Sequence, residues 1–338
     1  MPVIVNAKAQ HPFLPSLGDF SAIEIERAKH QDIRPLEVVI LNLMADKYTT
    51  ERQLATWLGH TPLQVNLTFA CTDDYVKAIR NGRYSYNTSS DHIKKFYNGF
   101  SDIKDLKFDG LVVTGINALQ TEIEDASLWP DVRTIFDWSK THVFSSLFLC
   151  WGAQAALKHF FNVDSLQQEK KIFGLFDHRI VLDSTGLLRG FPDVFPIPIS
   201  RWQSSRKSDI HQLQELEIVA TFHDNEPSIL VESQPYEQGH RHYPRRIYML
   251  SHPEYETMTL KDEYERDRLL IEGAPLPENY FPGNNPTLTP TNTWRYTASI
   301  YANWIKAIYE STPYNLSAIP EAFHQTHLWH TPLSKKSL

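Results

Sequence analysis

The 338-residue sequence is poor in cysteine, with only Cys71 and Cys150, and it has no excess of basic residues. Two cysteines in so long a chain do not make a disulfide framework, so we expect reduced thiols and a cytoplasmic protein. The net charge of −7, with no basic stripe, argues against nucleic acid as a partner. No apolar run approaches the ~18 residues of a membrane span, and the N-terminus lacks the pattern of a signal peptide, so we expect no membrane partner.

Short β-branched apolar runs alternate with amphipathic segments in the first half of the chain. The predicted strands cover residues 35–43, 63–71, 108–115 and 143–150, and the predicted helices cover 49–62, 131–142 and the stretch after Cys150. Apolar runs of this kind are typical of strands buried on both faces. Their alternation with helices predicts an α/β fold, a mostly parallel sheet with helices on both faces.

The second half of the chain predicts further strands, partly antiparallel, and a C-terminal helical elaboration. These strands cover residues 174–182, 216–222, 228–233 and 245–251, and the helices cover 263–273 and 293–311. Without a linker or repeat, we expect an irregular segment (1–34), one α/β domain (35–320) and a tail (321–338). The tail places His324, His327 and His330 three apart, but with no carboxylate or cysteine nearby we expect no metal site.

Cys150 stands where a predicted strand turns sharply into a helix, in the stretch "LFLCWGAQAA". In open parallel sheets, ligands bind beyond the carboxyl ends of the strands. A helix N-terminus carries partial positive charge, which favours a thiolate, and its N–H groups can hold a developing oxyanion. Cys150 is therefore a candidate nucleophile, although a lone cysteine is more commonly a small buried hydrophobe.

A nucleophilic cysteine needs a base and a group that orients this base. The stretch "YMLSHPEYE" delivers His252 at the end of an apolar strand, followed by Pro253 and Glu254. The proline stiffens the link, so that Glu254 can hold the imidazole while His252 faces Cys150. A single histidine among 15 is more often a surface or core residue, but the combination with the cysteine elbow is more specific than either motif alone.

A cysteine elbow with a distant His-Pro-Glu resembles the class I glutamine amidotransferase-like superfamily, which has a flavodoxin-like sheet and a Cys-His-Glu triad. Within it, the chain resembles the homoserine O-acyltransferases of methionine biosynthesis, usually named homoserine O-succinyltransferases. The similar pieces run in order from about residue 32 to about residue 320 and include "FDGLVVTG", "SSLFLCWGAQAAL", "KIFGLFDH", "HPEYETMTL" and "TPYNL".

The resemblance implies a ping-pong reaction with acyl-CoA as co-substrate, no resident cofactor and a homodimer. Cys150 takes the acyl group from CoA, His252 moves protons and Glu254 orients His252. Backbone N–H groups at Trp151 and Ile116 hold the oxyanion. The acyl group then passes to the side-chain hydroxyl of homoserine or a close relative. Because no glycine-rich phosphate loop is present, we expect no nucleotide beyond CoA.

Matches to family positions also imply the residues that recognise the amino acid. Arg266 binds its carboxylate, a task suited to a bidentate guanidinium. Glu263 lies three residues earlier, on the same helical face, and takes the ammonium group; a surface ion pair is the simpler interpretation of both. Further matches that line the site or the acyl donor are Lys47, Lys171, Ser200 and Arg201.

The departures from the family concern the acyl group. The usual "LMPKK" is "LMADK" here, "TGAP" is "TGIN" with Ile116 and Asn117, and "PHSR" is "PISR". Leu119 aligns where succinyl-transferring members carry Gly and acetyl-transferring members carry Glu. A leucine fills the space of a succinyl tail and offers its carboxylate no partner, which favours acetyl. The sequence leaves open acetyl or succinyl as the acyl group, and homoserine or serine as the acceptor.

Two other classes of function remain as alternatives. A glutamine amidotransferase usually has Gly two residues before the cysteine, where this chain has Phe148, and it needs a synthetase that is absent here. A non-catalytic homologue is disfavoured because Cys150, His252 and Glu254 are all present.

Overall fold

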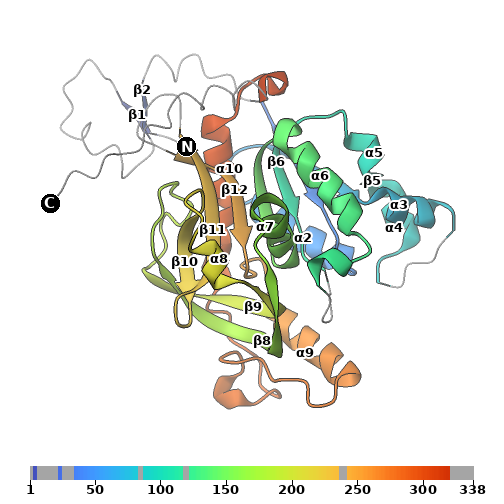
Figure 1. Cartoon of the computed structure of the whole chain (residues 1–338), viewed down its shortest axis with the longest axis vertical. Helices are drawn as coiled ribbons and strands as arrows, with labels where there is room; N and C mark the ends of the chain where they lie inside the picture. The colour runs from blue at the N-terminus through green and yellow to red at the C-terminus, as the bar shows by residue number, and fades with distance from the viewer. Residues whose placement is uncertain are drawn as a thin grey trace.

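The computed structural model describes residues 3–5, 22–24, 34–82, 87–116, 122–235 and 242–319. Its main sheet has ten strands in the order β5-β4-β3-β6-β7-β12-β11-β10-β8-β9 (Figure 1). The first six run parallel and are β5 (Tyr97–Gly99), β4 (Val65–Cys71), β3 (Leu36–Leu41), β6 (Phe108–Val113), β7 (Val143–Leu149) and β12 (His242–Met249). A separate parallel pair is formed by β1 (Val3–Val5) and β2 (Ala22–Glu24).

The other four strands of the main sheet pair antiparallel, beginning on β12. They are β11 (Glu226–Pro235), β10 (Glu217–Phe222), β8 (Ser165–Ile180) and β9 (Val194–Ser205). The long β8–β9 hairpin reaches past the carboxyl ends of the parallel strands (Figure 1), where the Pro198 carbonyl accepts from the His252 N–H at 2.8 Å. The antiparallel part of the sheet therefore contributes to the edge at which ligands are expected.

Helices cover both faces of the parallel strands, as the apolar runs predicted (Figure 1). On one face, α6 (Trp129–His142) and α7 (Trp151–Phe161) pack on one core cluster. On the other, α2 (Lys47–Leu58) and α10 (Ser299–Ser311) pack on a second cluster. Strand residues alternate between the clusters: Val39 and Leu41 belong to the first, Val38 and Ile40 to the second. The predicted fold class is thus confirmed.

Smaller helices complete the described chain. They are α3 (Asp73–Arg80), α4 (Ser90–Phe96), α5 (Phe100–Ile103), α8 (Lys207–Ile210) and α9 (Thr259–Leu270), with 3₁₀ turns at Ile123–Asp125, Pro282–Asn284, Arg295–Ala298 and Leu316–Ala318. No helix in the described ranges is both long and apolar enough to cross a membrane.

Several predicted boundaries are wrong. The structure starts β8 at Ser165, earlier than the predicted residue 174, and adds β9, which "FPIPISRW" concealed because Pro196 and Pro198 argue against a strand. Proline is tolerated there because β9 is an edge strand. The helix predicted from residue 49 begins at Lys47, because the side chain of Asp46 caps it by accepting from the Thr49 N–H.

A buried carboxylate fastens the amino end of the parallel sheet. Asp109, which is 0% exposed, accepts hydrogen bonds from the Arg34 guanidinium at 2.7 and 2.8 Å, from the Glu37 N–H at 2.8 Å and from the Thr312 hydroxyl at 2.7 Å. Arg34 precedes β3, Glu37 lies within β3, and Thr312 follows α10. One side chain therefore ties the first parallel strand to the last helix.

We expect Asp109→Asn to lower the free energy of unfolding by about 3 kcal/mol, because it leaves a half-buried guanidinium without its charge partner. Urea denaturation measures this change. The matched control is Asp105→Asn, an exposed residue four positions earlier, which should change stability by less than about 0.5 kcal/mol. Equal stability of the two variants would contradict the assigned role of Asp109.

Candidate active site

Cys150 occupies a strained elbow between β7 and α7. Its φ of 50° and ψ of −115° lie in a region that non-glycine residues rarely adopt. Its N–H donates to the Met249 carbonyl of β12 at 2.8 Å, and its carbonyl accepts from Ala153 and Gln154, in the first turn of α7. The side chain is 7% exposed and lines a pocket at the carboxyl edge of the sheet. Strain held in place by such contacts is common where a side chain must be presented to a ligand.

Two glycines allow the loop after β6 to lie against the elbow. A Cβ on Gly152 would lie 2.7 Å from the Thr114 carbonyl oxygen, so no larger residue fits at this position without a shift of backbone. A Cβ on Gly115 would lie 3.3 Å from the Cβ of Cys150 and 3.5 Å from the Trp151 nitrogen. The close approach brings together the two segments that carry the predicted oxyanion-hole amides, those of Trp151 and Ile116, and both residues line the pocket.

His252 and Glu254 follow β12, the parallel neighbour of β7. The Nδ1 of His252 lies 2.7 Å from the Oε1 of Glu254, and both side chains are buried. Burial lowers the pKa of His252, but the Cys150 side chain, through charge and a hydrogen bond, and the Glu254 carboxylate outweigh it. The pKa of the imidazole is therefore raised well above its ordinary value, which favours a protonated imidazole facing the sulfur.

Two tyrosines, which the sequence analysis did not single out, complete the surroundings of this pair. The ring of Tyr255 stacks on the His252 imidazole with centroids 4.2 Å apart, and its hydroxyl donates to the Oε1 of Glu263 at 2.6 Å. Tyr301 of α10 donates to the Oε2 of Glu254 at 2.9 Å. Tyr255 directly follows the His-Pro-Glu motif, a position that could have drawn attention to it.

A wall of charged groups from α9 and the β8–β9 hairpin faces Cys150. The Nζ of Lys171 lies 2.7 Å from the Oδ2 of Asp267 and 3.4 Å from the Oε2 of Glu263. Ser200 donates a short hydrogen bond to the same oxygen of Glu263, and its carbonyl lies 3.8 Å from the sulfur of Cys150. The predicted residues Lys171, Ser200 and Glu263 are thus brought together.

Asp267 is a further residue that sequence reasoning missed. Its Oδ1 accepts from the Nε and Nη2 of Arg266 at 2.9 and 2.6 Å, while its Oδ2 holds Lys171. Burial alone would raise the pKa of Asp267, but the two cations lower it below its ordinary value. The spacing of four from Glu263, one helical turn, is the signal that could have found it.

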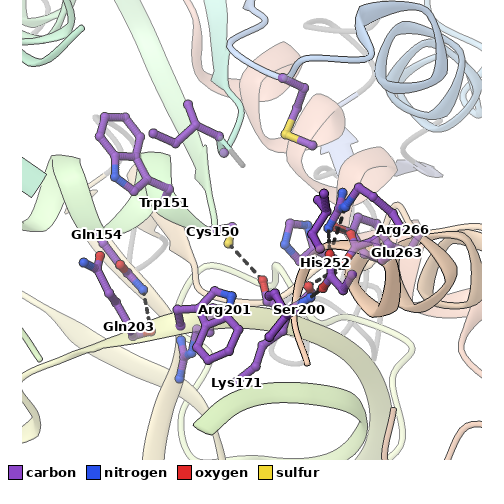
Figure 2. A pocket seen from close by; sticks show the side chains of 18 residues that line it. Cys150, Trp151, Gln154, Lys171, Ser200, Arg201, Gln203, His252, Glu263 and Arg266 are labelled. Atoms are coloured by element: carbon purple, nitrogen blue, oxygen red, sulfur yellow. Dashed lines mark hydrogen bonds and ion pairs between the residues drawn. The ribbon is translucent and has the colours of Figure 1, made fainter. Parts of the chain in front are cut away.

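The pocket has two unlike sides. His252, Glu263 and Arg266 gather on one side of Cys150, while Trp151, Gln154 and Gln203 lie on the other (Figure 2). The second side includes an amide contact of 2.9 Å from the Gln154 side chain to the Gln203 carbonyl. The full lining consists of Met44, Gly115, Ile116, Cys150, Trp151, Gln154, Lys171, Ser200, Arg201, Trp202, Gln203, His252, Tyr255, Glu263, Arg266, Asp267, Leu270 and Ile271.

Other predicted site residues are placed differently. Lys47 does not line the pocket: its buried ammonium donates to the carbonyls of Asn42 and Met44 at 2.8 and 3.0 Å. Arg201 does line it; its Nη1 donates to the Leu250 carbonyl at 3.2 Å, and its Nε and Nη2 are buried. A substrate contact through either side chain stays a prediction.

Asn117 and Leu119, predicted to set acyl specificity, and the histidines of the tail lie outside the described residues. Across the part of the chain that the structure describes, no group of three His, Cys, Asp or Glu side chains is arranged to hold a metal ion.

A mostly parallel sheet with a Cys-His-Glu constellation at its carboxyl edge defines the class I glutamine amidotransferase-like fold. A solved glutamine amidotransferase from Thermotoga maritima matches the structure with a TM-score of 0.50 and 11% identity, covering 82% of this chain and 100% of that one. At this identity the match shows a common fold.

The chain belongs to the homoserine O-succinyltransferase family, whose model matches residues 3–314. A homoserine O-acetyltransferase of Desulfitobacterium hafniense strain Y51 is 43% identical over 303 residues, which cover 89% of this chain and 93% of the relative. One from Thermotoga neapolitana is 42% identical over 296 residues, covering 87% and 91%. The protein is an O-acyltransferase, and the family resemblance of its sequence is confirmed.

The close approach of Gly152 to Thr114 generates a prediction. Gly→Ala in a helix ordinarily stabilises by up to about 1 kcal/mol, but Gly152→Ala should instead destabilise by about 1–3 kcal/mol, because the new methyl group meets a backbone oxygen. Urea denaturation gives the sign of the change in the free energy of unfolding. Alkylation of Cys150 by iodoacetamide should also slow, because the elbow shifts. A stabilised variant with normal alkylation would contradict this packing.

Proposed function

We propose that this protein transfers an acetyl group from acetyl-CoA to the side-chain hydroxyl of homoserine through an acyl-enzyme on Cys150. The observation that carries the proposal is that Cys150 shares one pocket with His252, which is held by the buried Glu254, and with the charged wall that includes Glu263 and Arg266. A nucleophile, a base and a zwitterion-binding surface in one pocket are what acyl transfer to an amino acid requires.

In the first half-reaction, the thiolate of Cys150 attacks the carbonyl carbon of the thioester. A new carbon–sulfur bond forms, and the carbonyl oxygen takes up negative charge beside the N–H groups of Trp151 and Ile116. The tetrahedral intermediate collapses by breaking the bond to the sulfur of CoA. His252, whose raised pKa keeps it protonated, gives its proton to the departing thiolate.

In the second half-reaction, the neutral His252 accepts the proton of the homoserine hydroxyl as this oxygen attacks the acyl-thioester of Cys150. The carbon–sulfur bond to Cys150 breaks, the acyl group leaves as an ester, and the thiolate again faces a protonated imidazole. Glu254 stabilises that imidazolium in both half-reactions and fixes which ring nitrogen faces the substrate.

The charged wall suits the α-amino and α-carboxylate groups of the acceptor. Lys171 and Arg266 contribute two positive charges, and Glu263 and Asp267 contribute two negative charges. A zwitterion adds no net charge to this set, so its ammonium can pair with Glu263 and its carboxylate with Arg266 without leaving an uncompensated charge. Arg266 retains a 43% exposed side chain, which leaves it able to reach a ligand.

The opposite side of Cys150, with Trp151, Gln154 and Gln203, is the place we assign to the acyl donor (Figure 2). Relatives at 41–43% identity carry the name homoserine O-acetyltransferase, which supports acetyl over succinyl. The bulk of Leu119, aligned with the residue that distinguishes the two donors in the family, points the same way.

Incubation with acetyl-CoA and no acceptor should add the mass of one acetyl group, located on Cys150 by peptide mapping. Cys71→Ala should label normally, because Cys71 is buried away from the pocket, whereas Cys150→Ala should not label. Adding homoserine should discharge the adduct, and serine tests the alternative acceptor. Labelling by succinyl-CoA alone would overturn the choice of donor, and absence of any adduct with both donors would overturn the acyl-enzyme.

Arg266→Ala should raise the KM for homoserine about 10- to 100-fold, the value of a lost charge-assisted hydrogen bond. The KM for acetyl-CoA should change less than about twofold. Arg268→Ala is the control, because Arg268 lies on the same helix, is exposed and pairs with Glu265. Steady-state release of free CoA thiol measures both constants. An equal rise of both KM values would refute carboxylate recognition by Arg266.

A further inference from the structure

The carboxylate that orients His252 has a second donor on the C-terminal helix. Glu254 uses Oε1 for His252 at 2.7 Å and Oε2 for the hydroxyl of Tyr301 at 2.9 Å. Both side chains are buried, with exposed fractions of 5% for Glu254 and 0% for Tyr301. Each carboxylate oxygen therefore has a donor of its own, and the two contacts together fix the plane of the carboxylate.

The position of α10 against the sheet is fixed by Trp304, which lies on the same face of the helix as Tyr301. Trp304, one turn after Tyr301, donates through its indole N–H to the Ser145 hydroxyl of β7 at 2.9 Å. Its ring lies over Gly110 of β6, where a Cβ would come within 3.0 Å of the indole. On the other side, Asn303 donates to the carbonyls of Leu187 and Arg189. Packing of α10 against β6, β7 and the Leu187–Arg189 segment therefore sets the position of the Tyr301 hydroxyl.

We propose that Tyr301 is a positioning residue that holds the Glu254 carboxylate and sets the proton affinity of His252. The inference rests on the proposed function to the extent that His252 is the base of the reaction. The hydroxyl directs the positive end of its dipole toward the carboxylate and so weakens the negative potential at the imidazole. Tyr301 thus limits how strongly Glu254 retains the proton on His252.

The other groups around His252 do not take over this role. Cys150, at the start of α7, faces the imidazole. Tyr255, which directly follows the His-Pro-Glu motif, stacks on it. The Tyr255 hydroxyl is directed to Glu263 instead. In the acyl-enzyme the sulfur of Cys150 carries no charge, so Glu254 remains the anionic partner of His252 when His252 must act as a base.

The variant Tyr301→Phe removes the hydroxyl and keeps the ring. The acidic limb of the pH profile of kcat should move to higher pH by about half to one pH unit, because His252 holds its proton more strongly and becomes neutral only at higher pH. At pH 7, kcat should therefore fall several-fold. KM values for both substrates should change less than about twofold. Tyr309→Phe removes a hydroxyl from the same helix, packs on the same core cluster and should leave the profile unchanged.

A measurement without turnover separates this inference from the proposed function. In a Cys150→Ala background, ¹³C-histidine NMR follows the titration of His252, assigned by His252→Gln, with Tyr301 or with Tyr301→Phe. A higher midpoint in Tyr301→Phe supports the inference, even if the protein transfers no acyl group. An unchanged or lower midpoint, or an effect equal to that of Tyr309→Phe, would overturn it.

Discussion

The pairing of β12 with β7 is the contact on which the site depends. The two strands run parallel with Met249 opposite Leu149, so they end at the same level of the same sheet edge. The next residue of β7 is the elbow of Cys150, and its N–H is bonded to the Met249 carbonyl at 2.8 Å. Residues separated by about a hundred positions in the sequence, Cys150 and His252, thereby meet with little freedom. A register shift of one residue would move His252 along the sheet edge relative to Cys150 by the rise of one strand residue, roughly 3.3 Å.

Around this contact, charge is balanced locally rather than by solvent. The imidazole of His252 is matched by Glu254, and the Lys171 ammonium is matched mainly by Asp267. Buried charges without partners are costly, whereas pairs with further hydrogen bonds persist. Glu263 departs from this pattern, because it accepts from two hydroxyls and has its cation only at 3.4 Å. A carboxylate that is well hydrogen-bonded but only loosely paired with a cation is suited to bind an added ammonium group.

The sequence allowed the parallel strands β3, β4, β6 and β7 and the Cys150–His252–Glu254 constellation to be predicted, because both rest on local patterns: apolar runs, a strand–turn–helix and a stiff His-Pro-Glu. It did not reveal β9, since proline in an apolar run is evidence against a strand until the strand is known to lie at an edge. Asp267 was not predicted as a site residue for a different reason. A carboxylate on an amphipathic helix is usually solvated, and only the fold brings Lys171 close to it.

Tyr301 is the clearest case of a residue whose contacts could not be predicted from the sequence. In the sequence it is one apolar position of an amphipathic helix, and in the structure it does belong to the core that α10 buries. Its hydroxyl has a second role only because Trp304 fixes the helix against β7, so that the phenol ends within hydrogen-bonding distance of Glu254. The ring of Tyr301 therefore belongs to the core, while its hydroxyl is bonded to the carboxylate that holds His252. Docking of the last helix and placement of the Glu254 carboxylate are consequently coupled, because the Tyr301 hydroxyl and the His252 imidazole each hold one of its oxygens.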